Sequence, residues 1–430
     1  MDRTQIKDLK QKIGEKVRIS GFVQARRDQG GIKFFVVRDV TGTVQVVFLK
    51  GAGEVFIKAG EVSLESVVSI EGLVKEEKQA PGGFEISAEN LEILSSAEPE
   101  LPIPVLEEKS GEPTDITKRL DWRWIDLRKD ENLKIFKVWT ELEKGFRQYW
   151  DSQYYIQIYT PSLMGTASET GSDVFKLQYF EREAYLAQSP QFYKQMAQAS
   201  GFEKVFCVGP VFRAEPSFTS RHMTEFTGWD FELSYINSHL DVMTEEENLL
   251  VSGFTQLQKT VLPDLEIPSV PFPRLTMEEA KDRLSKSGIK AGRKYDLSGE
   301  EEIELSRIIK EETGHDFVFV TDWPAEARPF YHMRYENNPG VTKSFDLLYK
   351  GLEVTTGSQR EHRYDVLISQ AKEKGMSVES LEDYLNFFKF GCPPHGGAGI
   401  GPGRLVMKIL NTPSVKEVTF LPRDVRRLKP

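Results

Sequence analysis

The stretch FRAEPSFTSRHMTEF, residues 212–226, gathers opposed charges between two apolar runs. Arg213 and Glu215 stand two positions apart at the end of a strand-like run, so on a strand they would project from the same face. The following loop adds Arg221 and His222. An arginine presents a planar fork to phosphate or carboxylate, and a glutamate accepts from an amino group. The stretch predicts a site for an anionic ligand that carries an amine, although a surface ion-pair cluster would have the same composition.

A glycine-rich run, GGAGIGPGRLVMKIL (396–410), enters a helix further along the chain. Glycines permit a close approach of the backbone to a ligand, and Arg404 falls in the first turn of that helix, where anions are favoured. The run is not a Walker A loop, because no Lys-Ser/Thr pair follows. Glycine-rich packing without a ligand is the alternative interpretation.

A third segment, SFDLLYKGLEVTTGSQREHR, brings two carboxylates near each other. Asp346 and Glu353 flank a predicted turn at KG, on strands that would pair antiparallel. With the hydroxyl of Thr356 they offer the oxygen ligands that Mg²⁺ prefers. Arg360 follows on the next turn and could clamp a carboxylate. A solvated hairpin with one exposed acid on each strand is the alternative.

The elements that would position these residues fall into two classes along the chain. Residues 17–100 read as five short strands with Gly-rich turns and a helix near 53–60, which suits a small closed barrel of the OB type. Further on, helical periodicity alternates with strands, and residues 276–312 read as an inserted helical stretch. We predict an α+β protein with three parts: an OB-type barrel over 1–102, a hinge or linker over 103–130, and a large domain over 131–430.

Composition and charge narrow the class of protein. The chain of 430 residues is 39% hydrophobic and 28% charged, which indicates packed globular domains. Its net charge of −10 argues against non-specific wrapping of nucleic acid. With two cysteines, Cys207 and Cys392, neither a disulfide framework nor a cysteine zinc site is predicted. The start lacks a signal-peptide core and no apolar run is long enough to cross a bilayer, so we expect a cytoplasmic protein without a membrane segment.

The predicted barrel carries a locally basic segment within this acidic chain. Residues 17–40 hold five basic residues and two acidic ones, with Phe22, Phe34 and Phe35 among them. OB-type barrels hold single-stranded nucleic acid by stacking bases on aromatic rings beside cations. Because neighbouring residues of a strand point to opposite faces, one of Phe34 and Phe35 must fill the barrel core. The other ring is a candidate for base stacking.

Together these segments resemble the three signature motifs of class II aminoacyl-tRNA synthetases. FRAE…RHMTEF is similar to motif 2, GIGPGRLV to motif 3, and YYIQIYTPSLMG (154–165) to motif 1, which builds the dimer interface in that family. Further stretches resemble the aspartyl-tRNA synthetases of the archaeal type: LDWRWIDLR, SETGSDVFKLQYF, YLAQSPQFYKQM, GLEVTTGSQREHR, CPPHGGAGIG and FLPRDVRRL. The likeness covers nearly the whole chain. It implies an OB-fold anticodon-binding domain and a class II catalytic domain with an antiparallel sheet flanked by helices.

The resemblance implies a reaction in two steps. Aspartate and ATP would give aspartyl-adenylate and pyrophosphate, and the aspartyl group would then pass to the terminal adenosine of a tRNA. The chain would use ATP, Mg²⁺, L-aspartate and tRNA, and it would act as a homodimer. Charge develops on phosphate or acyl oxygens in both steps, so positioning and electrostatics would carry most of the catalysis.

Matching the motifs residue by residue implies roles for individual side chains. The catalytic groups would be Arg213, Arg404 and Glu353. ATP would contact Arg213, Glu215, Arg221, His222, Met223, Glu353, Gly401 and Arg404. Aspartate would lie against Glu169, Gln191, Lys194, Arg213, Asp230, Thr356 and Arg360. The metal would be organised by Asp346, Glu353 and Thr356, and the anticodon would be read by Arg27, Phe34, Gln45 and Glu85.

Two alternatives stay open at the level of sequence. Asparaginyl-tRNA synthetases share the architecture, but Lys194 and Arg360 suit the carboxylate of an aspartate side chain, whose burial needs cationic partners. A nucleic-acid-binding paralogue without catalysis is the other, and Gly403 supports it, since the family normally has an acidic residue just before the motif 3 arginine. Gln24 stands where archaeal relatives often use an aromatic residue or histidine tied to anticodon discrimination. Charging of aspartate tRNA alone, or of asparagine tRNA as well, therefore stays open.

Overall fold

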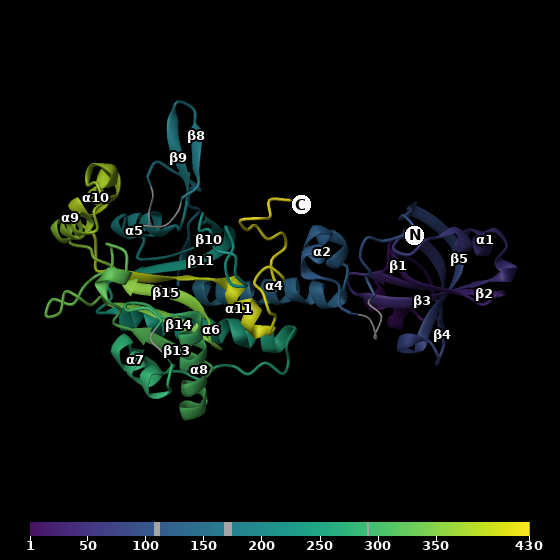
Figure 1. Ribbon diagram of the computed structural model, residues 1–430. Helices are drawn as coiled ribbons and strands as arrows, with labels where there is room; N and C mark the ends of the chain where they lie inside the picture. Colours follow the sequence, from purple (N-terminus) through teal and green to yellow (C-terminus); the bar gives the residue numbers. More distant parts are fainter. Residues whose placement is uncertain (107–111, 167–173, 290–291, 430) are drawn as a thin grey trace. The chain divides into compact units, whose positions relative to one another are not determined.

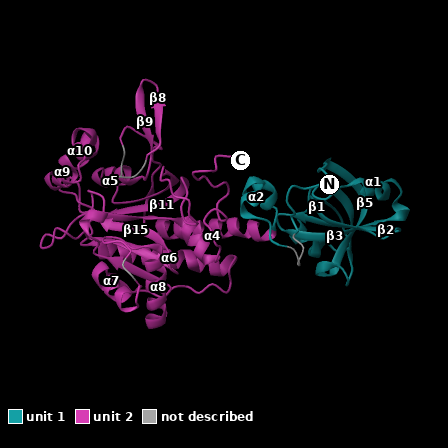
Figure 2. Cartoon of the chain, viewed as in Figure 1, with its two compact units in different colours: residues 1–129 teal, residues 130–430 magenta. Residues whose placement is uncertain are grey.

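The computed structural model describes residues 1–430 except 107–111, 167–173, 290–291 and 430. It divides the chain into two compact units, Met1–Lys129 and Asp130–Pro430 (Figure 2). The segment predicted as a hinge contains α2 (Ile116–Asp121) and α3 (Arg123–Asp126) and is grouped with the first unit. The three-part division at 102 and 130 stays a prediction. Among the described residues, every helix is too short or too polar to span a bilayer.

Unit 1 is built on a closed five-stranded barrel, which confirms the predicted architecture (Figure 1). The helix predicted near 53–60 is α1 (Glu54–Glu61). Phe35 is 1% exposed and fills the barrel core, while Phe34 is half-buried on the outer face, as strand alternation requires. In the order of their pairing, the strands are β1 (Lys16–Asp28), β2 (Ile32–Asp39), β3 (Gly42–Leu49), β5 (Phe84–Ser95) and β4 (Val67–Glu76).

Unit 2 is organised around one eight-stranded sheet. Its six central strands, β13 to β10, pair antiparallel as predicted, while the two edge strands pair parallel with their neighbours and make the sheet mixed. The order is β12 (Arg274–Thr276), β13 (Phe317–Thr321), β14 (Ser344–Tyr349), β15 (Glu353–Gln359), β16 (His395–Ile400), β11 (Glu225–Ser234), β10 (Lys204–Phe212) and β6 (Ile156–Gln157).

Two long helices, α4 (Asp130–Ser152) and α6 (His239–Thr260), pack on one face of this sheet and share its main apolar core. They approach each other very closely at two glycines. A Cβ atom on Gly145 would lie 2.7 Å from the Cα of Gly253, so a larger side chain has no room there. The close crossing lets both helices cover the apolar face and leaves the opposite face for polar residues.

The predicted helical insertion is present as α7 (Met277–Lys286) and α8 (Gly299–Thr313). Each begins with a capping box, Thr276 with Glu279 and Ser298 with Glu301, which satisfies the free N–H groups of the first turn. At its other end, α8 stops at Gly314, whose φ of 78° is a left-handed C-cap. These two helices pack on the sheet around β12 to β14.

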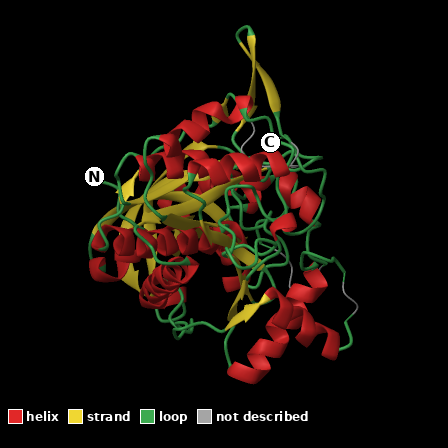
Figure 3. Ribbon diagram, turned by 90° about the vertical axis from the view of Figure 1, so that its left-hand side faces the viewer, coloured by secondary structure: helices red, strands yellow, loops and turns green. Residues whose placement is uncertain are grey.

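The remaining elements of unit 2 lie around the polar face of the sheet. A hairpin of β8 (Lys176–Tyr179) and β9 (Arg182–Leu186), joined at its base by β7 (Leu163–Met164), projects from the rest of the unit (Figures 1 and 3). Helices α5 (Gln191–Ala199), α9 (Tyr364–Glu373) and α10 (Glu382–Lys389) form a separate apolar cluster. The last helix, α11 (Pro402–Ile409), follows the glycine-rich strand β16.

Candidate active site

Strand alternation places acidic residues on the polar face of the sheet. In β11, Trp229 and Phe231 point into the core against α4 and α6, so Asp230 and Glu232 point to the other face. In β14, Phe345 lies in the same core, and Asp346 therefore faces the same way as Asp230. Asp230, Glu232 and Asp346, which come from distant segments of the chain, thus share one face of one sheet.

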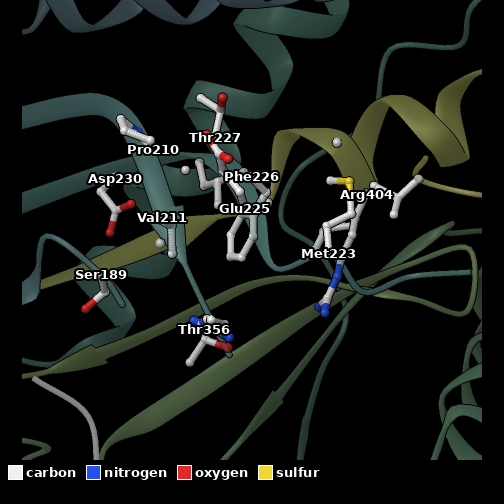
Figure 4. Close-up of a pocket in the computed structure, with 18 of the residues that line it drawn as sticks. Ser189, Pro210, Val211, Met223, Glu225, Phe226, Thr227, Asp230, Thr356 and Arg404 are labelled. Atoms are coloured by element: carbon white, nitrogen blue, oxygen red, sulfur yellow. The ribbon is translucent and has the colours of Figure 1, made fainter. Parts of the chain in front are cut away.

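A cavity of about 730 Å³ opens above this face. Asp230 and Ser189 lie at one end of it, Met223 and Arg404 at the other, and Thr356 between them (Figure 4). Most of the predicted site residues line this cavity: Gln191, Arg213, Glu215, Arg221, His222, Met223, Asp230, Glu353, Thr356, Arg360, Gly401 and Arg404. The structure brings these residues of motifs 2 and 3 and of the acidic hairpin to one place.

Three predicted residues of the catalytic unit are not among those that line the cavity. Lys194 lies behind the wall, where it touches the cavity-lining Asp230. Asp346 also lies behind the wall, paired with the cavity-lining Arg328. Glu169 falls outside the described residues. Lys194 and Asp346 therefore act on the cavity indirectly, because each is ion-paired with a charged residue that lines it.

One end of the cavity rests on a buried cluster of four charged side chains, of which Asp230 and Arg360 line the cavity. The Nζ atom of Lys194 is 2.8 Å from Asp230 Oδ2 and 3.3 Å from Glu232 Oε2. On the other side of Glu232, Arg360 Nε donates to Oε1 at 2.9 Å. Lys194 and Glu232 are each 0% exposed and Arg360 is 2% exposed. Two cations and two carboxylates thus balance their charges in a space without bulk water.

The mutual contacts of this cluster keep Lys194, Glu232 and Arg360 ionised. Burial opposes the charge of Lys194, but Asp230 and Glu232 outweigh it and hold the pKa of the lysine above its ordinary value. Burial likewise disfavours the carboxylate of Glu232, yet Arg360 and Lys194 bring its pKa below the ordinary value. For Arg360, burial opposes the charge and Glu232 raises the pKa. Lys194, Glu232 and Arg360 therefore stay charged around neutral pH.

A second layer of polar contacts fixes the Arg360 guanidinium. Its Nη2 donates to Gly397 O at 2.9 Å and its Nη1 donates to Ser358 Oγ at 2.7 Å. The same Nη1 lies 3.2 Å from Nε2 of His332, which must accept because arginine only donates. Burial and then Arg360 hold the pKa of His332 well below its ordinary value, consistent with a neutral ring. The guanidinium is thereby held in one orientation.

The motif 2 hairpin differs from the prediction in one respect. We expected Arg213 and Glu215 to share a strand face, but β10 ends at Phe212. The backbone N–H of Arg213 donates to Thr224 O at 2.9 Å, and regular pairing stops there, so Glu215 belongs to the loop. The guanidinium of Arg213 lies 5.5 Å from the ring centroid of Phe226. Both side chains still line the cavity, because the loop turns back over it.

At the other end of the cavity, two arginines are held by carboxylates. Arg221 Nη1 lies 2.8 and 2.9 Å from the two oxygens of Glu302. Arg404 Nη1 is 3.3 Å from Glu353 Oε1 and donates to Glu353 O at 3.0 Å. Gly403 removes the acidic residue that the resemblance leads one to expect, but Arg404 keeps a carboxylate partner in Glu353.

The predicted metal ligands lie together on the antiparallel pair β14–β15. Asp346 is directly opposite Thr356 in the ladder, and Thr356 Oγ1 donates to Glu353 Oε1 at 3.2 Å. Arg328, which the sequence analysis missed, is 2.8 Å from Asp346 Oδ1 and packs over the ring of Trp323. Burial raises the pKa of Asp346 to about 6, with Glu353 adding to the rise and Arg328 opposing it.

The four predicted anticodon residues lie on the outer face of the barrel in unit 1. Arg27 on β1 and Phe34 on β2 are paired in register, with the guanidinium 4.8 Å from the ring centroid. On the next two strands, Gln45 Nε2 donates to Glu85 Oε2 at 2.8 Å. A ring flanked by a cation and an amide–carboxylate pair is a surface of the kind on which a nucleic-acid base stacks.

Two sequence families match the chain. The family described as "tRNA synthetases class II (D, K and N)" matches residues 115–425, and the family described as "OB-fold nucleic acid binding domain" matches residues 17–94. A barrel followed by a mixed sheet carrying motif 2 and motif 3 arginines is the arrangement that such a pair of families leads one to expect. The chain belongs to the class II tRNA synthetases of the aspartate, lysine and asparagine group.

Individual relatives cover the chain from end to end. The aspartate–tRNA(Asp/Asn) ligase of Methanopyrus kandleri is 43% identical over 426 residues, 97% of this chain and 96% of that protein. The aspartate–tRNA(Asp) ligase of Pyrococcus abyssi is 41% identical and covers 97% of both chains. The crystal structure of asparaginyl-tRNA synthetase from Pyrococcus horikoshii complexed with asparaginyl-adenylate has a TM-score of 0.92 at 32% identity, with both chains covered completely.

The Arg328–Asp346 pair predicts a pH-dependent loss of stability on substitution. The folded protein holds the Asp346 proton more tightly than an ordinary aspartate with a pKa of 3.8, so the free energy of unfolding falls as pH rises toward about 6. In Arg328→Gln the pKa of Asp346 rises further. Each unit of this rise lowers the free energy of unfolding at high pH by about a further 1.4 kcal/mol. Thermal unfolding should therefore show a larger deficit at pH 8 than at pH 5.

The double variant Arg328→Gln/Asp346→Asn is the control for this measurement. It removes the titrating group and should abolish the difference between the two pH values, while the packing over Trp323 stays lost at both. An equal loss of Tm at pH 5 and pH 8 in Arg328→Gln would show that the pair contributes packing alone.

Proposed function

We propose that the chain attaches L-aspartate to tRNA in two steps, of which the first consumes ATP, and that the catalytic unit carries out both. The observation that carries this proposal is the buried cluster of Lys194, Arg360, Asp230 and Glu232 at one end of a cavity whose other end holds arginines. Curated relatives named aspartate–tRNA ligases, about 40% identical over the full chain, support the choice of amino acid.

The buried cluster accounts for recognition of aspartate through an exchange of partners. The ammonium group of the amino acid pairs with Asp230, beside Gln191, and this releases Lys194 from part of its contact with Asp230. The β-carboxylate of the substrate then meets Lys194 and Arg360. A full charge on the ligand repays the cost of its own burial when it meets two fixed cations, whereas the neutral amide of asparagine gains less.

The arginine-rich end accounts for recognition of ATP. Arg213 faces the α-phosphate and the α-carboxylate of aspartate, while Arg221, His222 and Arg404 face the β- and γ-phosphates, and Glu215 faces the adenine amino group. In the first step an α-carboxylate oxygen forms a bond to the α-phosphorus. The bond from that phosphorus to the bridging oxygen breaks, and pyrophosphate leaves with both electrons. No general base is required, because the attacking carboxylate is already ionised.

Asp346, Glu353 and Thr356 fit a magnesium ion at this step. They are two carboxylates and a hydroxyl, the oxygen ligands that Mg²⁺ takes, and the buried Asp346 Oδ1 has a cation, Arg328 Nη2, 2.8 Å away. No group of three or more His, Cys, Asp or Glu side chains in the described ranges is arranged for a metal. Asp346, Glu353 and Thr356 would hold the ion, which would neutralise phosphate charge when bound.

In the second step a hydroxyl of the terminal adenosine of tRNA bonds to the carbonyl carbon of aspartyl-adenylate, and the bond to the phosphate oxygen breaks to release AMP. The barrel selects the tRNA, with a base stacked on Phe34 and the Gln45–Glu85 pair reading a neighbouring base edge.

The central claim is tested with tRNA transcripts. We expect aspartate-dependent ATP–pyrophosphate exchange and aspartylation of aspartate tRNA, and charging of asparagine tRNA decides whether the barrel discriminates.

In the same assays, exchange supported by asparagine and not by aspartate would reject the proposed amino acid and favour an asparaginyl enzyme. The asparaginyl-tRNA synthetase structure reported above, 32% identical, makes this the relevant competitor. Absence of exchange with either amino acid would favour a nucleic-acid-binding paralogue without catalysis.

The resemblance to motif 1 also leads us to propose a homodimer. The motif lies at the edge of the sheet that ends in β6, where apolar side chains are strongly exposed. Tyr154 is 89% exposed, Tyr159 is 83% exposed and Ile156 is 47% exposed. Such a face is stabilised when a second copy covers it. Sedimentation velocity at micromolar concentration should give a species of twice the chain mass, and a persistent monomer would reject the dimer.

Replacement of Phe34 distinguishes the role of unit 1 from that of unit 2 in one experiment. Phe34→Ala should raise the KM for tRNA about 10- to 100-fold, which is the worth of one stacked base. The ATP–pyrophosphate exchange rate should stay at the wild-type value, because the cavity is built by unit 2. A matched control is Phe22→Ala on the same barrel. An equal fall in exchange and in charging of Phe34→Ala would count against an anticodon role.

A further inference from the structure

Glu302, on the inserted helix α8, contacts Arg221 at the arginine-rich end of the cavity. We propose that Glu302 is a positioning residue for ATP: it fixes the Arg221 guanidinium and the backbone of Glu353 relative to Arg404, so that the triphosphate meets a preformed pair of cations. This inference rests on the proposed function, because it assigns Arg221 and Arg404 to the phosphates. It adds a residue outside the three motifs to that site.

The contacts form a closed ring of four residues. Both oxygens of Glu302 contact Arg221 Nη1, at 2.8 and 2.9 Å, and Glu302 Oε2 accepts the backbone N–H of Glu353 at 3.1 Å. Glu353 in turn pairs with Arg404, whose Nε donates to Arg221 O at 3.4 Å. Two ion pairs, Arg221 with Glu302 and Arg404 with Glu353, are thus joined through backbone atoms and connect the motif 2 loop, α8, β15 and α11.

The position of Glu302 is itself fixed by the start of its helix. Ser298 caps α8, and the N–H of Glu302 donates to Ser298 O at 2.9 Å. Glu302 is 5% exposed, so its carboxylate is shielded from water. A Cβ atom at Gly299 would lie 3.5 Å from Arg221 Nη1, an ordinary van der Waals contact, so the first turn of α8 lies beside this arginine. A helix end thus delivers one carboxylate to one arginine.

The geometry favours positioning over blocking. Both contacts with Glu302 use Nη1. Among the described residues, the Nη2 and Nε donors of Arg221 have no hydrogen-bond partner, so they can donate to an anion. Arg221 lies in a loop without regular structure, so without Glu302 its long side chain would lose rotamer freedom when it binds phosphate. Glu302 and Glu353 also each pair with one of the two cations, which offsets the repulsion between them.

The test is the KM for each substrate of ATP–pyrophosphate exchange in Glu302→Ala and Glu302→Gln. Loss of a charge-assisted contact, in which one arginine nitrogen meets both carboxylate oxygens, should raise the KM for ATP about 10-fold or more in Glu302→Ala. The KM for aspartate should change less than about two-fold, because the aspartate cluster lies at the other end of the cavity. Glu302→Gln keeps an acceptor for the Glu353 N–H and should give a smaller rise. It also keeps the test decisive if the alanine variant fails to fold.

Glu311→Gln is the matched control, because Glu311 lies on the same helix with a side chain 65% exposed and paired to Arg307. It should leave both KM values unchanged. An unchanged or lowered KM for ATP in folded Glu302 variants, or an equal rise for both substrates, would overturn the inference. If the wild type shows no aspartate-dependent exchange, the proposed function fails first. Calorimetric titration of ATP into wild type and Glu302→Ala then still tests the positioning role, since equal affinities would reject it.

Discussion

The arrangement of the catalytic unit depends on the simultaneous burial of two cations and two carboxylates under one face of its sheet. Removing one member of such a group leaves an uncompensated buried charge, which typically costs about 3–5 kcal/mol. Lys194 must therefore arrive on α5, Glu232 on β11 and Arg360 directly after β15 in fixed positions. The electrostatic requirement and the sheet topology impose the same geometry, and the pocket that results matches an amino acid with an acidic side chain.

A second consequence is the separation of tasks along the cavity. In β11 and β14, alternation sends aromatic side chains toward α4 and α6 and acidic ones to the opposite face. Cationic groups gather at both ends, but those near Glu232 are buried and neutralised, whereas Arg221 and Arg404 are half-buried and line the cavity. The first set suits a small charged group that is fully desolvated, and the second suits a triphosphate that keeps water and a metal around it.

Much of this could be predicted from sequence because the informative residues lie in local patterns. The barrel, α1, the α7–α8 insertion and the acidic hairpin follow from strand alternation, capping residues and turn glycines. Glu232 was missed, although it stands two positions from Asp230 on the same strand face. Arg328 and Glu302 carry no such local signal, since Glu302 sits in the charged run EEIE and meets Arg221 only through the tertiary fold. The end of β10 was misplaced because the loop begins before the charge pattern changes.

A crystal structure of the protein with a non-hydrolysable aspartyl-adenylate analogue tests the central claim most directly. The account predicts that a β-carboxylate oxygen lies about 3 Å from Lys194 Nζ and from the Arg360 guanidinium. The α-amino group should then replace Lys194 as the partner of Asp230, while the adenylate phosphate lies beside Arg213. A β-carboxylate turned toward solvent, with Lys194 still bound to both acidic residues, would contradict it.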